Sequence, residues 1–332
     1  MRRSALPYIL VLAASTVGMP AVDPALLHLV MPEARVIAGA DLRAARTSPF
    51  GLFLLDRGRT AEDPQFRRFL EATGFDPRED LYEVVLASTD DPKEHRGLIL
   101  ARGLFDVERI SALASQHGMS ASTYEGALVL TALPGARKDT PAEPGSLSFL
   151  NRSIAVAGDA ASVRAAIDRY RRGGAPLHPA LAARVMDLSR RYEFWSVSLA
   201  PAVEWRITPV PDQQLGDLLR NHPLQGIVET SGGVKLGPEI AVDAEVVARS
   251  DKDAAALADV VRFVAGMMAM NATDPKAAGA VKLLQSLKLV VEGARVKLSL
   301  RIPEADMEKV FLAAQASSRT SARRTLRHRR PQ

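Results

Sequence analysis

The sequence predicts an α+β protein made of two tandem, structurally similar units, each a mainly antiparallel sheet with helices packed on one face. The expected elements repeat a strand–strand–helix order, which antiparallel hairpins covered by helices satisfy. A proline-led segment also recurs at an offset of 155 residues, as DPALLHLVM at 23–31 and HPALAARVM at 178–186. The alternative is a chance match of a short segment, so the order of the elements is the stronger argument for an internal repeat. The composition, 47% hydrophobic and 24% charged, is that of a folded globular chain.

The first unit is expected to cover residues 22–174. It begins with a short helical segment in which proline takes the first helical position, where its missing N–H has no intrahelical partner to lose. Asp159 precedes a helix with Val163, Ile167 and Tyr170 on one face, and Gly173 ends it, so the start and stop signals agree. We expect strands at about 35–42, 81–88, 97–103, 127–133 and 146–157, and helices at about 48–57, 64–73, 106–117 and 160–172.

The second unit is expected to cover residues 175–316 and to meet the first near Gly173-Gly174-Ala175-Pro176. Val296, Leu298 and Leu300 alternate with polar residues, which is the period-two pattern of a half-buried strand. We expect strands at about 193–199, 225–231, 236–248, 287–292 and 295–302, and helices at about 212–221, 252–270, 275–286 and 304–316.

The N-terminal stretch MRRSALPYILVLAASTVGMPA predicts an export signal at residues 1–21. Two arginines precede an apolar run from Ala5 to Val17, and small residues follow it. The run is shorter than the roughly 20 residues that span a bilayer, although an uncleaved anchor at residues 4–22 and a buried helix stay open as alternatives. We therefore expect an exported protein, periplasmic or extracellular, with an inner-membrane anchored form as the alternative.

The net charge of +5 comes from the two ends of the chain. Two arginines open the chain and six lie in its last fourteen residues; without these eight, 35 basic residues face 38 acidic ones. The folded body is therefore not expected to bind nucleic acid. Residues 317–332 form a basic tail that is expected to be disordered. The tail is either a solvated terminus or a contact for an anionic surface, another polyanion or an envelope protein, and its candidate contact residues are Arg323, Arg324, Arg327, Arg329 and Arg330.

The segment GFDPREDL at 74–81 places three carboxylates ahead of an apolar run. Gly74 suits the position after a helix, and Asp76-Pro77 is a turn signal. If residues 77–80 form one helical turn, Asp76 caps it. The segment lacks the spacing of a calcium loop, so we interpret it as a joint between a helix and a strand.

Local catalytic and metal motifs are missing from the sequence. The chain has no cysteine, which excludes disulfides and thiolate chemistry. Its histidines and serines lie in no metal-binding or nucleophile pattern. The glycine-rich segment Ser231 to Gly237 is expected to be a hairpin turn rather than a phosphate loop. Trp205 is the better placed of the two tryptophans for an exposed contact, although burial under its proline-rich loop is the favoured interpretation. We therefore expect no catalytic residue, metal or cofactor.

Four segments carry a resemblance to a known group of proteins: MPEARVIAGADL, SPFGLFLL, ATGFDPREDLYEVVLAST and SIAVAGDAASVRAAID. Together they resemble uncharacterised exported bacterial proteins that are best represented in acidobacteria, over about residues 22–170. The resemblance implies a signal peptide, a strand in MPEARVIAGADL and a turn in GFDPREDL. That group has no assigned activity, so the resemblance implies no functional residue.

Two hypotheses for the function follow. The first is a non-enzymatic binding or structural module of the cell envelope or extracellular space, which the absence of local motifs favours. The second is a hydrolase whose carboxylates come together only in the folded chain. A flat or apolar groove between the two units would support the first, and a pocket of convergent carboxylates with a raised pKa would support the second.

Overall fold

The computed structural model describes residues 22–57, 70–89, 96–116, 118–132, 145–199, 226–270, 286–309 and 312. The expected α+β class is confirmed. The first half contributes the strands β1 (Val36–Asp41), β2 (Leu81–Ser88), β3 (Gly97–Gly103), β4 (Met119–Tyr124), β5 (Ala127–Ala132), β6 (Ser146–Phe149) and β7 (Ile154–Gly158). The second half contributes β8 (Phe194–Ser198), β9 (Ile227–Lys235), β10 (Glu239–Ala248), β11 (Lys288–Glu292) and β12 (Arg295–Pro303). The helices are α1 (Pro24–Leu27), α2 (Leu42–Ala45), α3 (Pro49–Arg57), α5 (Pro77–Asp80), α6 (Val107–Gln116), α7 (Ala160–Arg171), α8 (Pro179–Arg191) and α10 (Asp251–Met270).

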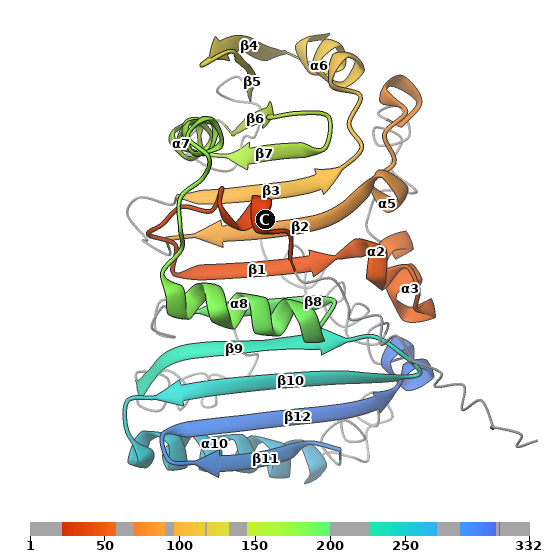
Figure 1. Ribbon diagram of the computed structural model, residues 1–332. Helices are drawn as coiled ribbons and strands as arrows, with labels where there is room; N and C mark the ends of the chain where they lie inside the picture. Colours follow the sequence, from red (N-terminus) through yellow and green to blue (C-terminus); the bar gives the residue numbers. More distant parts are fainter. Residues whose placement is uncertain are drawn as a thin grey trace, which may run out of the picture.

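The strands form one continuous antiparallel sheet in the order β11-β12-β10-β9-β8-β1-β2-β3-β7-β6-β5-β4 (Figure 1). The two halves meet where β1 pairs with β8, with Ile37 opposite Val197 and Gly39 opposite Trp195. Outward from this seam, the strands follow in the order β1, β2, β3, β7, β6 in the first half and β8, β9, β10, β12, β11 in the second. In both halves the first three strands are in sequence order and the next two are in reverse order. The first half carries an additional hairpin, β4–β5, at its outer edge.

Helices cover both faces of the sheet, whereas one covered face was expected. We call the face toward which Ile37 and Val197 point the first face; α1, α7 and α8 pack there, in the largest core cluster. The opposite, second face carries α6, α10 and α3 in three smaller clusters. In Figure 1, α8 passes in front of the sheet and α10 behind it. The reason lies in strands such as β5, where the neighbours Val129 and Leu130 point to opposite faces and are both buried, so that each face needs a cover.

Several local predictions are confirmed. Asp159 caps α7 by accepting a hydrogen bond from the Ser162 N–H at 2.8 Å, and Gly173 follows the helix with φ +84°. The segment GFDPREDL is a joint, as interpreted. Gly74 has φ +68°, and the Asp76 carboxylate accepts the Arg78 N–H at the start of the single-turn helix α5.

Three local predictions were wrong. Gly232 and Gly233 lie inside β9 rather than in a turn, because a Cβ at Gly233 would overlap the ring of Tyr192, which packs on the sheet there. The single strand expected at 146–157 is the hairpin β6–β7, turned by Asn151, whose side-chain oxygen accepts the Ser153 and Ile154 N–H groups. The strand β4 was not expected at all.

Other predictions concern residues outside the described part of the chain. These are the export signal, the basic tail with its five arginines, Trp205, most of the helix at 64–73, the helix at 212–221, nearly all of the helix at 275–286 and the end of the helix at 304–316. Within the described residues, no helix has the length and apolar character needed to cross a membrane.

Candidate functional site

An apolar groove lies on the second face of the sheet, across the seam between the two halves. We call it the junction groove. Its volume is about 590 Å³, and strands of both halves line it. The lining includes Ala38, Ala40, Val84, Leu86, Phe194, Ser196, Thr230, Gly232, Val234, Val242, Ala244 and Val246.

The register of the sheet explains why the groove exists. One row of paired residues crosses the seam on the second face, and its four central members are small. In order across β1, β8, β9 and β10 they are Ala38, Ser196, Gly232 and Ala244. Because these side chains are short, the sheet has a shallow floor in this row. The sequence distributes the four residues over 207 positions, so only the strand pairing brings them together.

Large apolar side chains stand on both sides of this floor. On the first-half side, Leu86 pairs with Ala38, and Ile99 pairs with Leu86; their exposed fractions are 47% and 44%. On the second-half side, Leu298 pairs with Ala244. An accessible strip of this kind is an uncommon feature of a sheet interior and marks a candidate binding surface.

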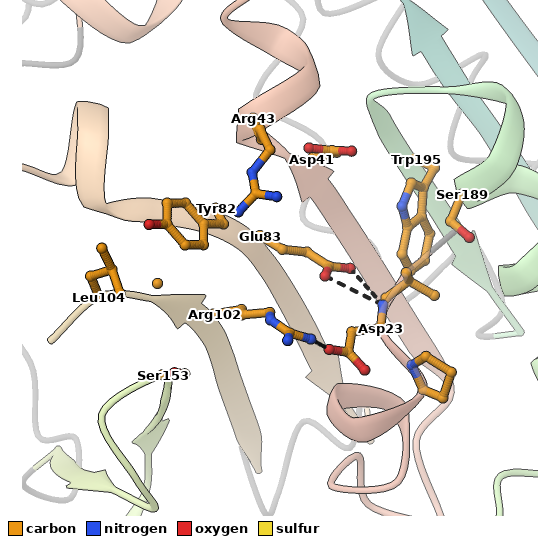
Figure 2. A pocket seen from close by; sticks show the side chains of 13 residues that line it. Asp23, Asp41, Arg43, Tyr82, Glu83, Arg102, Leu104, Ser153, Ser189 and Trp195 are labelled. Carbon is orange, nitrogen blue, oxygen red and sulfur yellow. Dashed lines mark hydrogen bonds and ion pairs between the residues drawn. The ribbon is translucent and has the colours of Figure 1, made fainter. Parts of the chain in front are cut away.

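A second, more polar cavity of about 460 Å³ lies on the first face, and we call it the carboxylate pocket. Its acids are Asp23, Asp41 and Glu83, and Arg43, Arg102, Tyr82, Ser153, Ser189 and Trp195 also line it. Asp41, Glu83 and Arg102 are neighbours in register across β1, β2 and β3. In Figure 2, Glu83 points toward Asp23, whose carboxylate the Arg102 guanidinium reaches.

Glu83 is the most perturbed acid of the pocket. Burial, and to a lesser degree the charge of Asp41, raises its pKa from 4.5 to about 7. Both of its carboxylate oxygens accept the Asp23 N–H, at 3.2 and 3.3 Å. These two contacts are long, so they offset little of the cost of keeping the group charged.

The other charged groups of the pocket have structural partners. Asp23 caps α1 by accepting the Ala25 N–H at 2.8 Å and pairs with Arg102. Asp41 caps α2 by accepting the Ala44 N–H, also at 2.8 Å. The Arg43 guanidinium lies 4.3 Å from the centre of the Tyr82 ring. The pocket can therefore hold and release a proton on Glu83, while its other acids hold the local fold.

The acids of GFDPREDL, which the sequence drew attention to, do not line the carboxylate pocket. Asp76, in the joint, pairs with Arg78, whose hydrogen bond lowers the pKa of Asp76 despite partial burial. Glu83, seven residues farther along, was not singled out, because in the sequence it is a lone acid within an apolar strand. No group of side chains able to hold a metal ion occurs among the described residues.

No protein-family model and no curated protein matches the chain. Two solved structures are similar in fold, crystal forms I and IV of TP0453, each with a TM-score of 0.48 and 11% sequence identity. The alignments cover 89% and 90% of this chain and 98% and 97% of the two TP0453 chains. At this identity the likeness concerns the fold alone.

Proposed function

We propose that the protein is an exported, non-enzymatic binding module and that the junction groove holds an apolar small molecule. The observation that carries this proposal is the row of four small residues between the exposed Leu86 on one side and the half-buried Leu298 on the other. A volume of about 590 Å³ lies within the range of small-molecule sites, roughly 300–1,000 Å³, and such sites are lined mainly by apolar side chains.

The energetics favour an apolar ligand over a charged one. Burial of apolar surface contributes about 25 cal/mol per Å², whereas a charged group on this floor would lose its water without gaining a partner. The row itself offers a single polar side chain, the hydroxyl of the exposed Ser196. We therefore expect binding that depends on contact area and shape, with little dependence on salt.

The proposal is tested by titrating the purified protein with an apolar fluorescent probe such as 1-N-phenylnaphthylamine. Ser196→Phe fills the floor and is expected to weaken probe binding at least tenfold. Thr123→Phe places the same ring at an exposed position on the second face of β4, outside the groove, and is the matched control. Equal probe affinity in the parent and both variants would refute the proposal.

The natural ligand can be sought separately. Organic extraction of protein purified from its own host, followed by mass spectrometry, is expected to release an apolar compound that the Ser196→Phe variant carries in reduced amount. A compound recovered equally from both proteins would indicate adsorption elsewhere on the surface.

Export rests on the N-terminal sequence, in which two arginines precede an apolar run. Cell fractionation is expected to place the mature protein outside the cytoplasm. Recovery of the intact N-terminus in the cytoplasm would contradict this.

The basic tail is a further proposed contact, for an anionic surface or envelope partner, through Arg323, Arg324, Arg327, Arg329 and Arg330. A pull-down from envelope extract with and without the last sixteen residues tests it. The expected result is a component that the full chain captures at low salt and that is lost both on truncation and when the full chain is washed at high salt. Capture of the same components by the full and the truncated chain would show that the tail makes no such contact.

A second candidate function is hydrolysis by carboxylates assembled in the folded chain. The convergence of Asp23, Asp41 and Glu83 on one cavity, with the raised pKa of Glu83, favours it. A panel of ester, phosphoester and glycoside substrates tests it, with Glu83→Gln as the variant. Turnover that Glu83→Gln abolishes, while Ser196→Phe leaves it unchanged, would establish this function.

A further inference from the structure

The strand β11 ends the sheet on the side of the second half. Its inner edge pairs with β12 over all five residues without a register shift, from Lys288 opposite Ser299 to Glu292 opposite Arg295. No described strand pairs with its outer edge. The strand has no proline and no bulge, two of the devices that keep an edge from pairing with another chain. It is therefore a regular edge whose outward backbone groups can accept one more strand.

We propose that β11 pairs with β11 of a second copy of this chain, antiparallel, about a two-fold axis at Val290. The occupant follows from the sequence of the strand, Lys-Leu-Val-Val-Glu, which complements itself when one copy is reversed. A two-fold axis at Val290 places residue 288 of one copy opposite residue 292 of the other, and residue 289 opposite residue 291. Such an interface is isologous, the commonest kind in homodimers.

The charges of the strand match in this arrangement. Lys288 of one copy lies opposite the partner's Glu292, and Glu292 lies opposite the partner's Lys288. Opposite charges across a strand pair stabilise it, and like charges would destabilise it. Within one chain, Glu292 already pairs with Lys297 of β12 at 2.6 Å. The partner's Lys288 would approach it from the open side, so that the carboxylate would lie between two ammonium groups.

The apolar residues also match. Val290, which is 49% exposed, would lie against the partner's Val290 on the first face. Leu289 would lie opposite the partner's Val291 on the second face, where both residues border the core beneath α10. The pairing would thus cover the exposed valine and extend that core across the axis.

The other outer strand, β4, lacks these features. Its residues Met119–Tyr124 carry no charge, and Ser120 to Thr123 are small or polar and exposed. Pairing of β4 with itself would gain no charge pair and bury no large apolar side chain that is now exposed. The two edges therefore differ, and β4 supplies matched control positions.

The expected dimer is weak. A five-residue strand pair buries less than the roughly 1,200–2,000 Å² of a standard stable interface, so we expect association in the micromolar range or above. Sedimentation velocity of the purified protein at rising concentration is expected to show a shift from monomer to dimer. A single monomeric species up to about 1 mM would refute the proposal.

Disulfide trapping detects a weak dimer directly, and the absence of native cysteine makes the result unambiguous. Val290→Cys puts a thiol on the axis, where directly opposed Cβ atoms lie about 4.5–5.5 Å apart, close enough to the span of a disulfide for oxidation to join them. Mild oxidation is expected to yield a covalent dimer from Val290→Cys and monomer from the control Ser122→Cys on β4. Equal cross-linking of both variants would indicate random collision and overturn the proposal.

Exchanging the two charges of β11 distinguishes a loss of strand pairing between copies from a loss of folding. Lys288→Glu and Glu292→Lys each place like charges opposite one another and are expected to weaken the dimer at least fivefold. The double variant restores opposite charges at both positions and is expected to recover most of the association. A double variant that associates as weakly as the single ones, while all three unfold cooperatively, would contradict the two-fold register.

Discussion

Glu83 illustrates how a residue's environment, rather than its place in a motif, sets its chemistry. The register of β2 places it on the first face, opposite Asp41, where the segment carrying α1 covers it. That segment lies sixty residues upstream, so its approach cannot be inferred from the neighbourhood of Glu83. The acids of GFDPREDL, by contrast, were interpreted correctly as structural, because caps and turns depend on residues next to one another.

The raised pKa of Glu83 predicts a pH-dependent stability. Below pH 4.5 the carboxyl is protonated in both the folded and the unfolded chain; between pH 4.5 and about 7 only the unfolded chain releases the proton. The free energy of unfolding should therefore fall over this interval, by at most about 3 kcal/mol, and stay level above it. Glu83→Gln should remove this fall, which urea unfolding at pH 5 and pH 8 can measure.

The control for this experiment is Glu108→Gln, at an exposed position of α6. It should leave the pH dependence of the parent protein unchanged. If Glu83→Gln retains the full dependence, the acid responsible lies elsewhere.

Two glycines at the seam show a constraint that the sequence analysis missed. Gly39 lies opposite Trp195, which in turn lies opposite Gly233, so glycine flanks the indole on both neighbouring strands. A Cβ at Gly39 would overlap the indole, and one at Gly233 would overlap Tyr192. The glycine-rich segment of β9 was mistaken for a turn because a lone sequence does not reveal that a large aromatic side chain packs over it.

At the scale of elements, strong periodicity was the reliable guide. The alternation from Val296 to Ile302 predicted β12, and the capped helix after Asp159 is α7. The strand β4 was missed because Met-Ser-Ala-Ser-Thr-Tyr has no apolar alternation and is a strand through its pairing with β5. The hairpin β6–β7 was merged into one strand because apolar residues flank its polar turn closely.

The internal repeat stays a prediction. It is supported by the matching strand order outward from the seam and by the equivalent placement of α6 and α10 on the second face. The halves also differ. The helix α7 covers the first face of its half, whereas residues 304–309 pack near α3 on the second face through Met307. Superposing 23–172 on 178–316 and finding that equivalent elements do not coincide would remove the prediction.

Glu304 joins the last described helical segment to the first half. Its carboxylate accepts the Phe50 N–H at 2.5 Å and the Ser48 hydroxyl at 3.0 Å. Glu304→Ala removes these charge-assisted bonds and should lower the free energy of unfolding by about 2 kcal/mol. Glu304→Gln keeps one acceptor oxygen and should cost clearly less. Denaturant unfolding of both variants tests this, and equal losses would show that the acceptor oxygen is not what matters.

At the scale of the whole molecule, the boundary expected near residue 174 does not separate two cores. The largest core cluster joins Ile37 and Val85 of the first half to Leu181, Val185 and Val197 beyond that boundary. Burying one such side chain contributes about 1.5–3 kcal/mol, and a typical domain is stable by only 5–15 kcal/mol. The core therefore depends on α8 and β8 as much as on the strands of the first half.

This predicts the behaviour of fragments. Residues 22–174 expressed alone should fail to fold cooperatively, because α8 and β8 are absent and the edge of β1 is open. Residues 22–199, which restore both elements, should fold better. Circular dichroism and denaturant unfolding of the two fragments provide the comparison. Cooperative unfolding of 22–174 with the stability of the full chain would show that the first half is an independent domain.

The pairing of β1 with β8 has a consequence for solubility. Two separate sheets would present four open margins to the surrounding solution, and each would be a place where a stray strand from a neighbouring polypeptide could attach. Fusing them side by side seals two of the four within the described fold. The chain has no disulfides and few aromatic residues. Pairing the two halves through β1 and β8 thereby halves the number of exposed strand edges at which it could aggregate, without any additional residues.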